Sequence, residues 1–486
     1  MPEPRAIFRR AIPDKEGFLS MILLPDSPST SRAGDQANDQ FSSGAGGGIK
    51  PCAEDLVSPA NASAAWARVR RNRGCAGVDG ITIAELEPCF GQTWRAISAT
   101  LLDGSYRPQP LLRARIPKPA GGLRLLAIPA VTDRVVQQAA AQTFATYWEP
   151  RFSNHSFAYR PRRGPHDALA VLEDEASRGA EWLLHLDIEN FFDSVPHAIV
   201  LSALRNELGD PRLAALVSRT LTCGVFENGL VRPTEIGLAQ GSPLSPLLAN
   251  IVLHRLDARL ESDGTQFVRY ADDCCVLLGD KKLAPGIKQL VTECLADLGL
   301  RLNEHKTAFG HFTCARFLGF SFQRNSRGKV VRLASPESMA DAEATFTRLV
   351  QSAGGSGEDV AAQAAEMLRS WLAYFYTSED EARLKALWGT ILAAWQARFP
   401  RLPIPDCMAW NTLLAGRVAG DHLDYSGKLR EDSPFFSSVD WSQTLQCLLL
   451  KLLRSRWWGV EYDLGLGRRP PALRLRLGGH RINLRF

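Results

Sequence analysis

The sequence is short of features that several classes of protein require. None of its ten cysteines forms a C-x-x-C pair, so neither a zinc ribbon nor a disulfide framework is indicated. No apolar run approaches the roughly 20 residues that cross a bilayer, and the N-terminus lacks the ordered regions of a signal peptide. A net charge of +5 over 486 residues is too mild to demonstrate a nucleic-acid partner. These absences favour a cytoplasmic protein without membrane association.

The composition is that of a globular chain, and its two ends differ from the middle. Hydrophobic residues make up 45% and charged residues 22%, and the length suffices for about two to four domains. Residues 1–50 are rich in Ser, Asp, Pro and Gly, which predicts a flexible leader. Residues 451–486 hold nine Lys or Arg against two acids. A strand expected at 471–477 could lie along nucleic acid, or be an edge strand kept soluble by arginine.

Two adjacent aspartates interrupt an apolar, β-prone stretch at 267–278. The pattern predicts a hairpin with Asp272 and Asp273 at its tip. Upstream, the apolar run 182–187 predicts a buried strand that ends at Asp187. An isolated acidic pair is most often a solvated turn, but clustered carboxylates repel one another and suit hard cations such as Mg²⁺. The three aspartates could hold two metal ions for phosphoryl transfer, which makes the chain a candidate polymerase.

A basic hairpin is predicted before the aspartates. Residues 111–117 alternate in polarity, and 123–128 follow the glycine pair at 121–122. Lys118 and Arg124 flank that tip, and both side chains suit phosphate groups. The hairpin is either a flap that contacts a triphosphate or nucleic-acid backbone, or a solvated edge protected by its charges.

A third block of interest spans residues 240–250. Ser245 is expected to cap a helix whose first residue is Pro246. Gly241 permits close approach of the backbone to a ligand, with Gln240 beside it. The alternative is an ordinary capped helix after a glycine turn. Strands alternate with helices around a small sheet, and residues 335–398 are helical in pattern, so the expected fold class is α+β.

Taken together and in this order, the blocks resemble the reverse transcriptases of the group II intron and bacterial retroelement lineage. The resemblance runs from about residue 71 to 322 and continues weakly to about 400. It is carried by a series of motifs: Ala76–Gly80, Ile116–Pro129 with Asp133–Gln137, Asp187–Asp193, Gln240–Pro246, Tyr270–Asp273, Leu302–Thr307 and Phe317–Phe320.

The resemblance implies a right-hand polymerase. Fingers would occupy 51–165, an α+β palm of antiparallel sheet and helices 166–325, a helical, maturase-like thumb 335–400, and a basic C-terminal extension 401–486. The implied activity is RNA-directed DNA polymerisation with two Mg²⁺ ions, in which a DNA or RNA primer is extended with dNTPs on an RNA template.

The resemblance also implies roles for individual residues. The metals would be held by three carboxylates and one backbone carbonyl: Asp187, Asp272, Asp273 and Ile188. Other positions would contact the incoming nucleotide, namely Lys118 and Arg124 at the triphosphate, Phe192 under the sugar, and Gln240 with Gly241 in the nucleotide and template pocket. Lys306 is either a proton donor to pyrophosphate or a surface lysine.

Departures from the family leave the biological setting open. The Cys-rich nuclease of intron-mobilising members has no counterpart in the cysteine spacing, so we expect no independent DNA cleavage. The Gln240-Gly241 pair with Ser245 argues against the diversity-generating branch. Intron maturase, CRISPR-associated and antiphage defence settings remain, with a structured intron or defence RNA as partner. The alternative function is an RNA-binding maturase that acts as a splicing cofactor, and a third is a basic structural module without catalysis.

Overall fold

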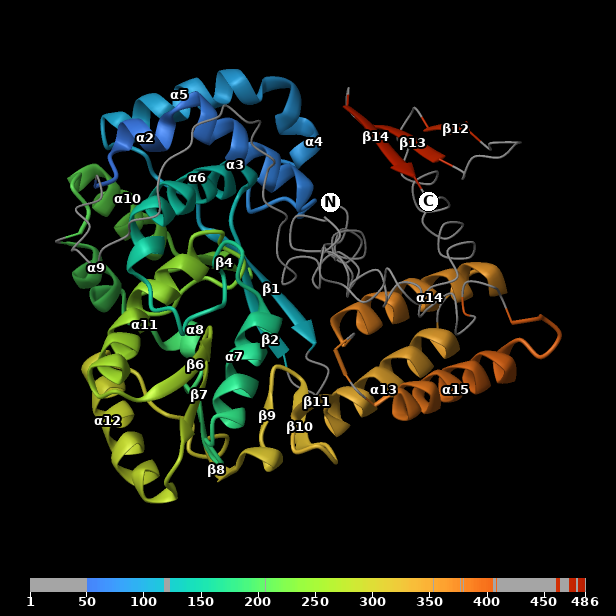
Figure 1. The fold of residues 1–486 in the computed structure, drawn as a ribbon. Helices are drawn as coiled ribbons and strands as arrows, with labels where there is room; N and C mark the ends of the chain where they lie inside the picture. The colour runs from blue at the N-terminus through green and yellow to red at the C-terminus, as the bar shows by residue number, and fades with distance from the viewer. Residues whose placement is uncertain are drawn as a thin grey trace. The chain divides into compact units, whose positions relative to one another are not determined.

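The structure is a computed structural model in which two compact units can be described, Met1–Asp341 and Ala342–Phe486 (Figure 1). Its described residues are 50–117, 123–205, 207–352, 354–375, 377–378, 380–404 and 408, with the backbone of three strands near the C-terminus. The predicted leader up to residue 49, Lys118 and most of the basic extension therefore lie outside the described residues. Arg124 is placed by its backbone alone.

Helices make up the N-terminal part of the first unit. They gather around α6 (Figure 1). The side chains of α6 are buried along most of its length. Asn61 of α3 fixes this packing, because its amide donates to Ala139 O and Thr143 Oγ1 of α6 at 3.1 Å each. The elements are α2 (Ala53–Val57), α3 (Pro59–Arg71), α4 (Ile83–Leu86), α5 (Phe90–Leu102) and α6 (Val131–Trp148), with 3₁₀ turns η1 (Glu87–Cys89) and η2 (Glu149–Arg151).

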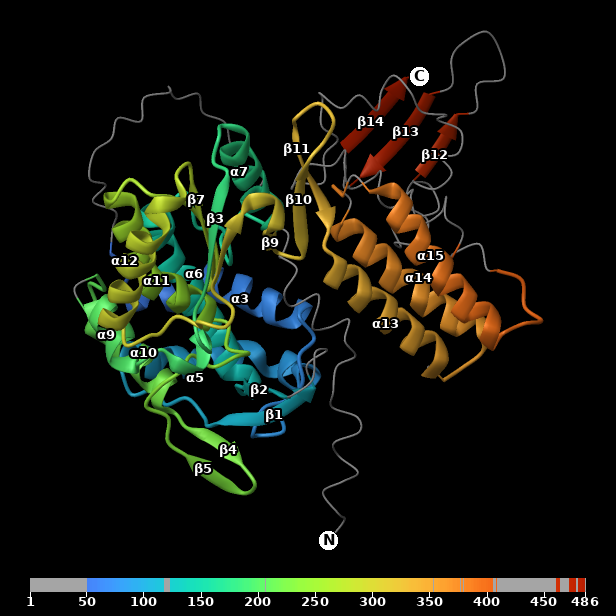
Figure 2. The same cartoon turned by 90° about the horizontal axis from the view of Figure 1, so that it is seen from below.

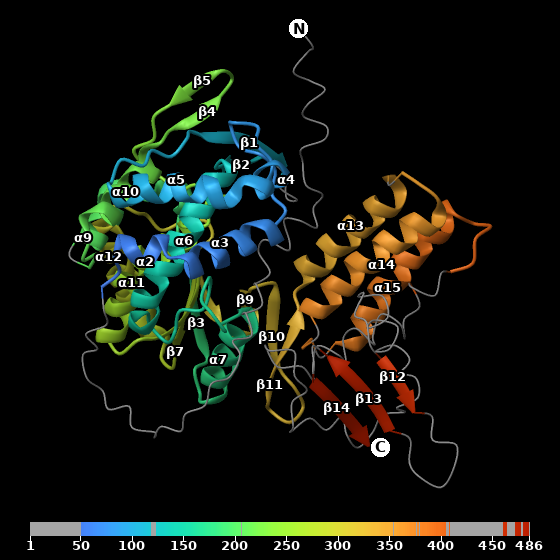
Figure 3. The same cartoon turned by 90° about the horizontal axis from the view of Figure 1, so that it is seen from above.

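The basic hairpin predicted from the sequence belongs to a four-stranded sheet. Strands β1 (Leu111–Pro117) and β2 (Leu123–Ile128) pair antiparallel, as expected. Strand β4 (Val225–Glu227) joins β1 in parallel and pairs with β5 (Leu230–Arg232). The β4–β5 hairpin projects from the helices around it (Figures 2 and 3), and Leu230 is 65% exposed. The sequence pattern did not predict the pairing of β1 with β4, which joins segments more than a hundred residues apart.

A second four-stranded sheet, the central sheet, carries the acidic residues. Its order is β6-β7-β3-β8, and every neighbouring pair is antiparallel. The strands are β3 (Trp182–Asp187), β6 (Gln266–Tyr270), β7 (Asp273–Leu278) and β8 (Ala308–His311). Because the inner strands β3 and β7 are largely buried, they are apolar runs rather than alternating ones.

Six helices accompany the central sheet. They are α7 (Pro165–Ser177), α8 (Phe191–Ser194), α9 (His197–Arg205), α10 (Pro211–Thr222), α11 (Ser245–Ser262) and α12 (Ala284–Asp297). Helix α11 begins one residue earlier than predicted, with Leu244 in place of Ser245 as its N-cap. The reason is that the turn before it is already closed: Ser242 Oγ accepts from Leu244 N at 3.2 Å, and Ser242 O accepts from Ser245 N at 3.3 Å.

A small sheet and three helices follow the central sheet in the chain, and a further sheet lies near the C-terminus. Strands β9 (Arg316–Phe317), β10 (Phe320–Arg324) and β11 (Val330–Ala334) pair antiparallel. Helices α13 (Pro336–Ser352), α14 (Gly357–Tyr374) and α15 (Glu381–Arg398) follow, and in the second unit Trp395 and Phe346 are almost fully buried. Strands β12 (Val460–Asp463), β13 (Ala472–Leu477) and β14 (His480–Arg485) form an antiparallel sheet, so the strand expected at 471–477 is present. The 3₁₀ turns η3 (Lys281–Leu283) and η4 (Phe312–Cys314) lie in the first unit.

The mixture of antiparallel sheets and helices is the α+β class predicted from the sequence, and it is consistent with a polymerase fold. Within the part of the chain that the structure describes, no helix combines the length and apolarity needed to span a bilayer.

A buried acid next to the basic hairpin gives a prediction about stability. Asp133 is 2% exposed and accepts hydrogen bonds from the Tyr106 hydroxyl and, at 3.0 Å, from Gln109 N. Burial raises the pKa of Asp133 to about 6. Because the folded-state pKa exceeds the unfolded one, the folded state binds the proton more tightly, and this stability is lost as pH rises through 6.

We expect Asp133→Asn to remove that pH dependence. Between pH 5 and 7.5 the wild-type free energy of unfolding should fall by about 1–2 kcal/mol relative to the variant, measured by urea titration at both pH values. Asparagine has a single acceptor oxygen and so loses one of the two hydrogen bonds. This loss does not depend on pH, so the difference between the two pH values isolates the titration. Parallel pH curves for the two proteins would contradict the prediction.

Candidate active site

The two adjacent aspartates lie where the sequence placed them, at the tip of the β6–β7 hairpin. Tyr270 pairs with Asp273 as the last pair of the ladder, which leaves Ala271 and Asp272 in the turn. Ala271 has φ +61°, in the left-handed region. Such a backbone is uncommon for alanine and marks a turn that its surroundings hold in place. The hairpin therefore presents Asp272 from a conformationally fixed turn.

The third aspartate is brought alongside by strand pairing. In the antiparallel β3–β7 ladder, Asp187 stands directly opposite Asp273. Asp187 O also accepts from Asn303 N at 2.8 Å, and Arg301 O accepts from Glu189 N at 2.9 Å. These two bonds bracket the isolated bridge between Ile188 and Leu302, and neither uses the carbonyl of Ile188. Side chains of directly opposed residues are close neighbours, so the sheet collects the acids that the sequence separates.

Basic side chains accompany two of the three aspartates. Lys306 Nζ lies 3.4 Å from Asp187 Oδ2, and the ring of His185 bonds Asp273 through Nε2. Burial on its own would lower the pKa of His185, but the hydrogen bond and charge of Asp273 outweigh it and the pKa is raised. Burial raises the pKa of Asp272, and the charges of Asp273 and Asp187 raise it further. Three carboxylates therefore share a site in which negative charge is costly.

These residues suit a divalent cation by their chemistry. Carboxylate and carbonyl oxygens are hard donors, and the raised pKa of Asp272 indicates a place where a cation would relieve repulsion. Within the described residues, no three His, Cys, Asp or Glu side chains form a ready-made metal cluster. In the structure Asp273 is bonded to His185, and Asp187 is paired with Lys306.

A glycine-bearing segment, residues 237–241, connects α8 with strand β2. Gly237 N donates to Val195 O at 2.8 Å, and Leu238 N donates to Phe192 O at 2.6 Å. Further along, Gln240 O accepts from Ala127 N of β2 at 2.9 Å. Gly241 has φ +120°, and a Cβ there would lie 3.1 Å from Ala127 O. Glycine is therefore required at 241 by the backbone conformation and by the close approach of β2.

Phe192 stands between the glycine segment and an exposed tyrosine. It lies in α8, with its ring edge-on to buried Phe191 at a centroid distance of 5.4 Å. The ring of Tyr159 is edge-on to Phe192 at 6.4 Å. Tyr159 is 45% exposed and has φ +62°. A partly exposed aromatic wall of this kind can receive the flat face of a sugar or a base.

Several contributors to the site were not predicted from the sequence. His185 lies two strand positions before Asp187 and therefore on the same face of the sheet. The alternation of side chains along a strand would have predicted this position. Arg269 is a charged residue inside an apolar strand and is completely buried, which in itself indicates a buried partner. Nothing in the sequence indicated a role for Tyr159 in the site, because an aromatic residue in a loop has many ordinary roles.

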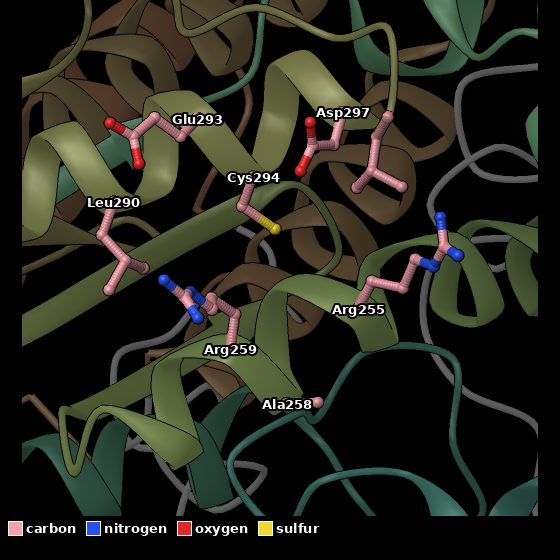
Figure 4. A pocket seen from close by; sticks show the side chains of 8 residues that line it. Arg255, Ala258, Arg259, Leu290, Glu293, Cys294 and Asp297 are labelled. Atoms are coloured by element: carbon pink, nitrogen blue, oxygen red, sulfur yellow. The ribbon is translucent and has the colours of Figure 1, made fainter.

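The structure also has a surface pocket away from these residues. It has a volume of about 670 Å³ and lies between α11 and α12 (Figure 4). Its lining combines two arginines, two acids and apolar side chains: Arg255, Ala258, Arg259, Leu290, Glu293, Cys294, Asp297 and Leu298. Figure 4 shows Arg259 and Cys294 entering the space between the helices. The mixed charge favours no ligand class, and no predicted site residue lines the pocket.

Comparison with known proteins identifies the region that holds the acidic residues. Residues 116–322 match the family model described as reverse transcriptase (RNA-dependent DNA polymerase). The protein YkfC of Escherichia coli K12 is 29% identical over 58% of this chain and 86% of its own length. The group II intron-encoded protein LtrA of Lactococcus lactis is 34% identical over 42% of this chain. The retron Mx65 reverse transcriptase of Myxococcus xanthus is 29% identical, also over 42%.

These relatives differ in how much of their length is matched. The alignment covers 34% of LtrA and 49% of the retron enzyme, so the similarity concerns one region shared by larger or differently built proteins. That region contains all three aspartates, Phe192, Gln240, Gly241 and Lys306. The comparisons support RNA-directed DNA polymerase activity for the shared region.

Proposed function

Residues 116–322 are a reverse transcriptase domain related to group II intron-encoded and retron proteins, and from this premise we propose that the protein extends a primer 3′-hydroxyl with dNTPs on an RNA template. The observation that carries the proposal is the meeting of Asp187 and Asp273 as opposed partners, with Asp272 beside them in a fixed turn. In this proposal residues 51–165 are fingers, 166–325 the palm and 335–400 a helical thumb.

The acidic residues would hold two Mg²⁺ ions. Asp187, Asp272 and Asp273 supply carboxylate oxygens, and Ile188 supplies its backbone carbonyl. When bound, such ions lower the pKa of an attacking hydroxyl and stabilise a leaving pyrophosphate. The fixed β6–β7 turn and the β3–β7 ladder hold these oxygens in place before substrate arrives, which is the positioning on which phosphoryl transfer depends.

The remaining predicted residues would bind and orient the nucleotide. Phe192 lies under the sugar, where its ring excludes a 2′-hydroxyl, and Gln240 with Gly241 lines the base and template side. Lys118 and Arg124 contact the triphosphate from the β1–β2 hairpin. Lys306 would give a proton to the leaving pyrophosphate. This role is supported by the 3.4 Å distance between Lys306 Nζ and Asp187 Oδ2 and by the 66% exposure of the lysine side chain.

Primer extension tests the proposal directly. The purified full chain is incubated with Mg²⁺, dNTPs and a primed template, with RNA and DNA templates of the same sequence and with DNA and RNA primers in parallel. We expect extension on the RNA template that requires both dNTPs and the divalent ion. Failure to extend either primer on either template would contradict the proposal.

A second candidate function is that of an RNA-binding splicing cofactor. It is favoured by the similarity to LtrA, a group II intron-encoded protein. The same protein can have both activities. Binding of a structured intron RNA without primer extension would favour the cofactor alone. A CRISPR-associated or antiphage defence setting would use the same polymerase reaction.

A further inference from the structure

A completely buried arginine lies in the strand that leads to the catalytic turn. Arg269 of β6 and Asp257 of α11 are both 0% exposed, and all five N–H groups of the guanidinium have acceptors. Nε donates to Asp257 Oδ1 and one terminal nitrogen donates to Asp257 Oδ2, both at 2.6 Å. The other three bonds run to Ser156 Oγ at 2.7 Å, Ala271 O at 2.9 Å and Asn250 Oδ1 at 3.1 Å.

One arm of this network holds the turn that presents Asp272. The acceptor at 2.9 Å is the carbonyl of Ala271, the residue with left-handed backbone immediately before Asp272. A left-handed alanine is strained, so its conformation has to be fixed by other contacts. The guanidinium supplies one of these contacts from inside the core, where a charge-assisted hydrogen bond is strong.

The other arm holds the loop that presents Tyr159. Arg269 N donates to His155 O at 2.8 Å, Arg269 O accepts from Phe157 N at 3.0 Å, and its side chain bonds Ser156. Asn250 continues the connection, since its amide donates to Ala158 O at 2.8 Å. The next residue is Tyr159, whose ring lies edge-on to Phe192. The same arginine therefore bonds both the loop beside the sugar wall and the turn beside the metal ligands.

We propose that Arg269 is a positioning residue that sets the metal-binding turn and the Tyr159 loop together, so that one buried network determines both divalent-cation affinity and discrimination between deoxyribose and ribose. The part of this inference that concerns discrimination between deoxyribose and ribose rests on the proposed function. The part that concerns divalent-cation affinity does not. Arginine is required at this position because only a planar group with five donors satisfies four acceptor residues at once.

The charge on the guanidinium is maintained by its partner. Burial alone would lower the pKa of Arg269, but Asp257 offsets this and the pKa is raised. Lysine has three donors on a single nitrogen and cannot span Asp257, Ser156 and Ala271 together. Arg269→Lys therefore keeps the charge while releasing part of the network, and it separates the geometric role of the residue from its electrostatic one.

The control for this substitution is an ion pair of similar form elsewhere in the same unit. Arg332 of β11 bonds Glu173 of α7 through Nε and a terminal nitrogen, and the two side chains are 11% and 20% exposed. Neither residue contacts the acidic turn or the Tyr159 loop in any bond described above. Arg332→Lys therefore reproduces the loss of a bidentate pair without touching either arm.

The first measurement is Mn²⁺ binding to the full-length proteins by electron paramagnetic resonance, without nucleotide. We expect Arg269→Lys to weaken Mn²⁺ binding about tenfold, the lower end of what loss of a supporting contact around metal ligands costs, while Arg332→Lys leaves it unchanged. Equal Mn²⁺ affinities for wild type and Arg269→Lys would overturn the proposed role of Arg269 in holding the metal-binding turn. This comparison holds whether or not the wild type extends primers, so it is decided separately from the proposed polymerase activity.

The second measurement uses Ser156→Ala, which deletes one hydrogen bond and leaves the ion pair intact, so that the variant folds even where Arg269→Lys does not. We expect the ratio of dNTP to rNTP incorporation efficiency to fall by about threefold or more, with Mn²⁺ affinity retained. If the wild type is active and Ser156→Ala has the same ratio of dNTP to rNTP incorporation, the proposed role of the network in holding the Tyr159 loop is overturned. A loss of Mn²⁺ affinity in Ser156→Ala would contradict the assignment of Ser156 to the Tyr159 loop alone.

Discussion

Replacing Asp272 with asparagine is expected to abolish nucleotide incorporation while the protein stays folded. The amide keeps the size of the side chain but not its charge, and charge neutralisation around a transferring phosphoryl group contributes several kcal/mol. We therefore expect kcat/KM for dNTP addition to fall by at least about 10³-fold, measured by single-nucleotide primer extension on an RNA template.

The accompanying change in stability distinguishes this result from unfolding. Burial and the charges of Asp273 and Asp187 raise the pKa of Asp272, so its ionised form destabilises the folded protein. Removal of that charge should leave the thermal unfolding midpoint unchanged or higher. Asp263→Asn is the matched control, because Asp263 is an exposed acid that bonds only the neighbouring Thr265 among the contacts described. Retained activity in Asp272→Asn would remove Asp272 from the set of metal ligands.

Replacing Phe192 with alanine is expected to relax the choice between dNTPs and rNTPs. The ring makes edge-on contacts with Phe191 and Tyr159 that restrict its movement, so in the proposed site it would collide with a 2′-hydroxyl. Removing it opens the space that the extra oxygen needs. We expect the efficiency of rNTP incorporation relative to dNTP to rise by about 10²-fold, the range that a steric pocket can supply, measured by kcat/KM for each nucleotide on one template.

The control for this substitution is another partly exposed aromatic residue of the same unit. Phe309 of β8 is 45% exposed and stacks on Trp182, so Phe309→Ala removes a similar surface without altering the site. It should leave the selectivity ratio unchanged. If Phe192→Ala lowered the incorporation of both nucleotides equally, Phe192 would be a packing residue rather than the determinant of sugar choice.

The features predicted correctly from the sequence are those with a short-range signal. Apolar runs ending at acidic residues predicted the strand before Asp187 and the hairpin around Asp272. The glycine pair with alternating flanks predicted the β1–β2 hairpin. The start of α11 was wrong by one residue, because the competing hydrogen bonds of Ser242 are a matter of local turn geometry. The assigned roles of Lys118, Arg124 and Lys306 stay predictions.

The features that were missed depend on contacts between distant parts of the chain. The bond between Ser156 and Arg269 joins residues 113 positions apart, and the pairing of β1 with β4 joins Leu111 to Val225. Periodicity carries no information about which segments meet. The grouping of Asp187 with Asp272 and Asp273 was predicted, but the strand register that sets Asp187 directly opposite Asp273 was not. Sequence patterns therefore indicated the candidate residues for the chemistry, but not what holds them in place.

The Arg269 network also has a consequence for the order in which the protein acquires activity. The turn before Asp272 is secured only when the loop at Ser156, 113 positions from Arg269 in the sequence, has reached the buried point where helix α11 and strand β6 meet. Closing so long a loop is slow compared with forming local helices and hairpins. A chain that has collapsed but has not docked this loop has its helices without the full network. We therefore expect the proposed polymerase activity to recover late in refolding, with the docking of this loop rather than with the return of secondary structure.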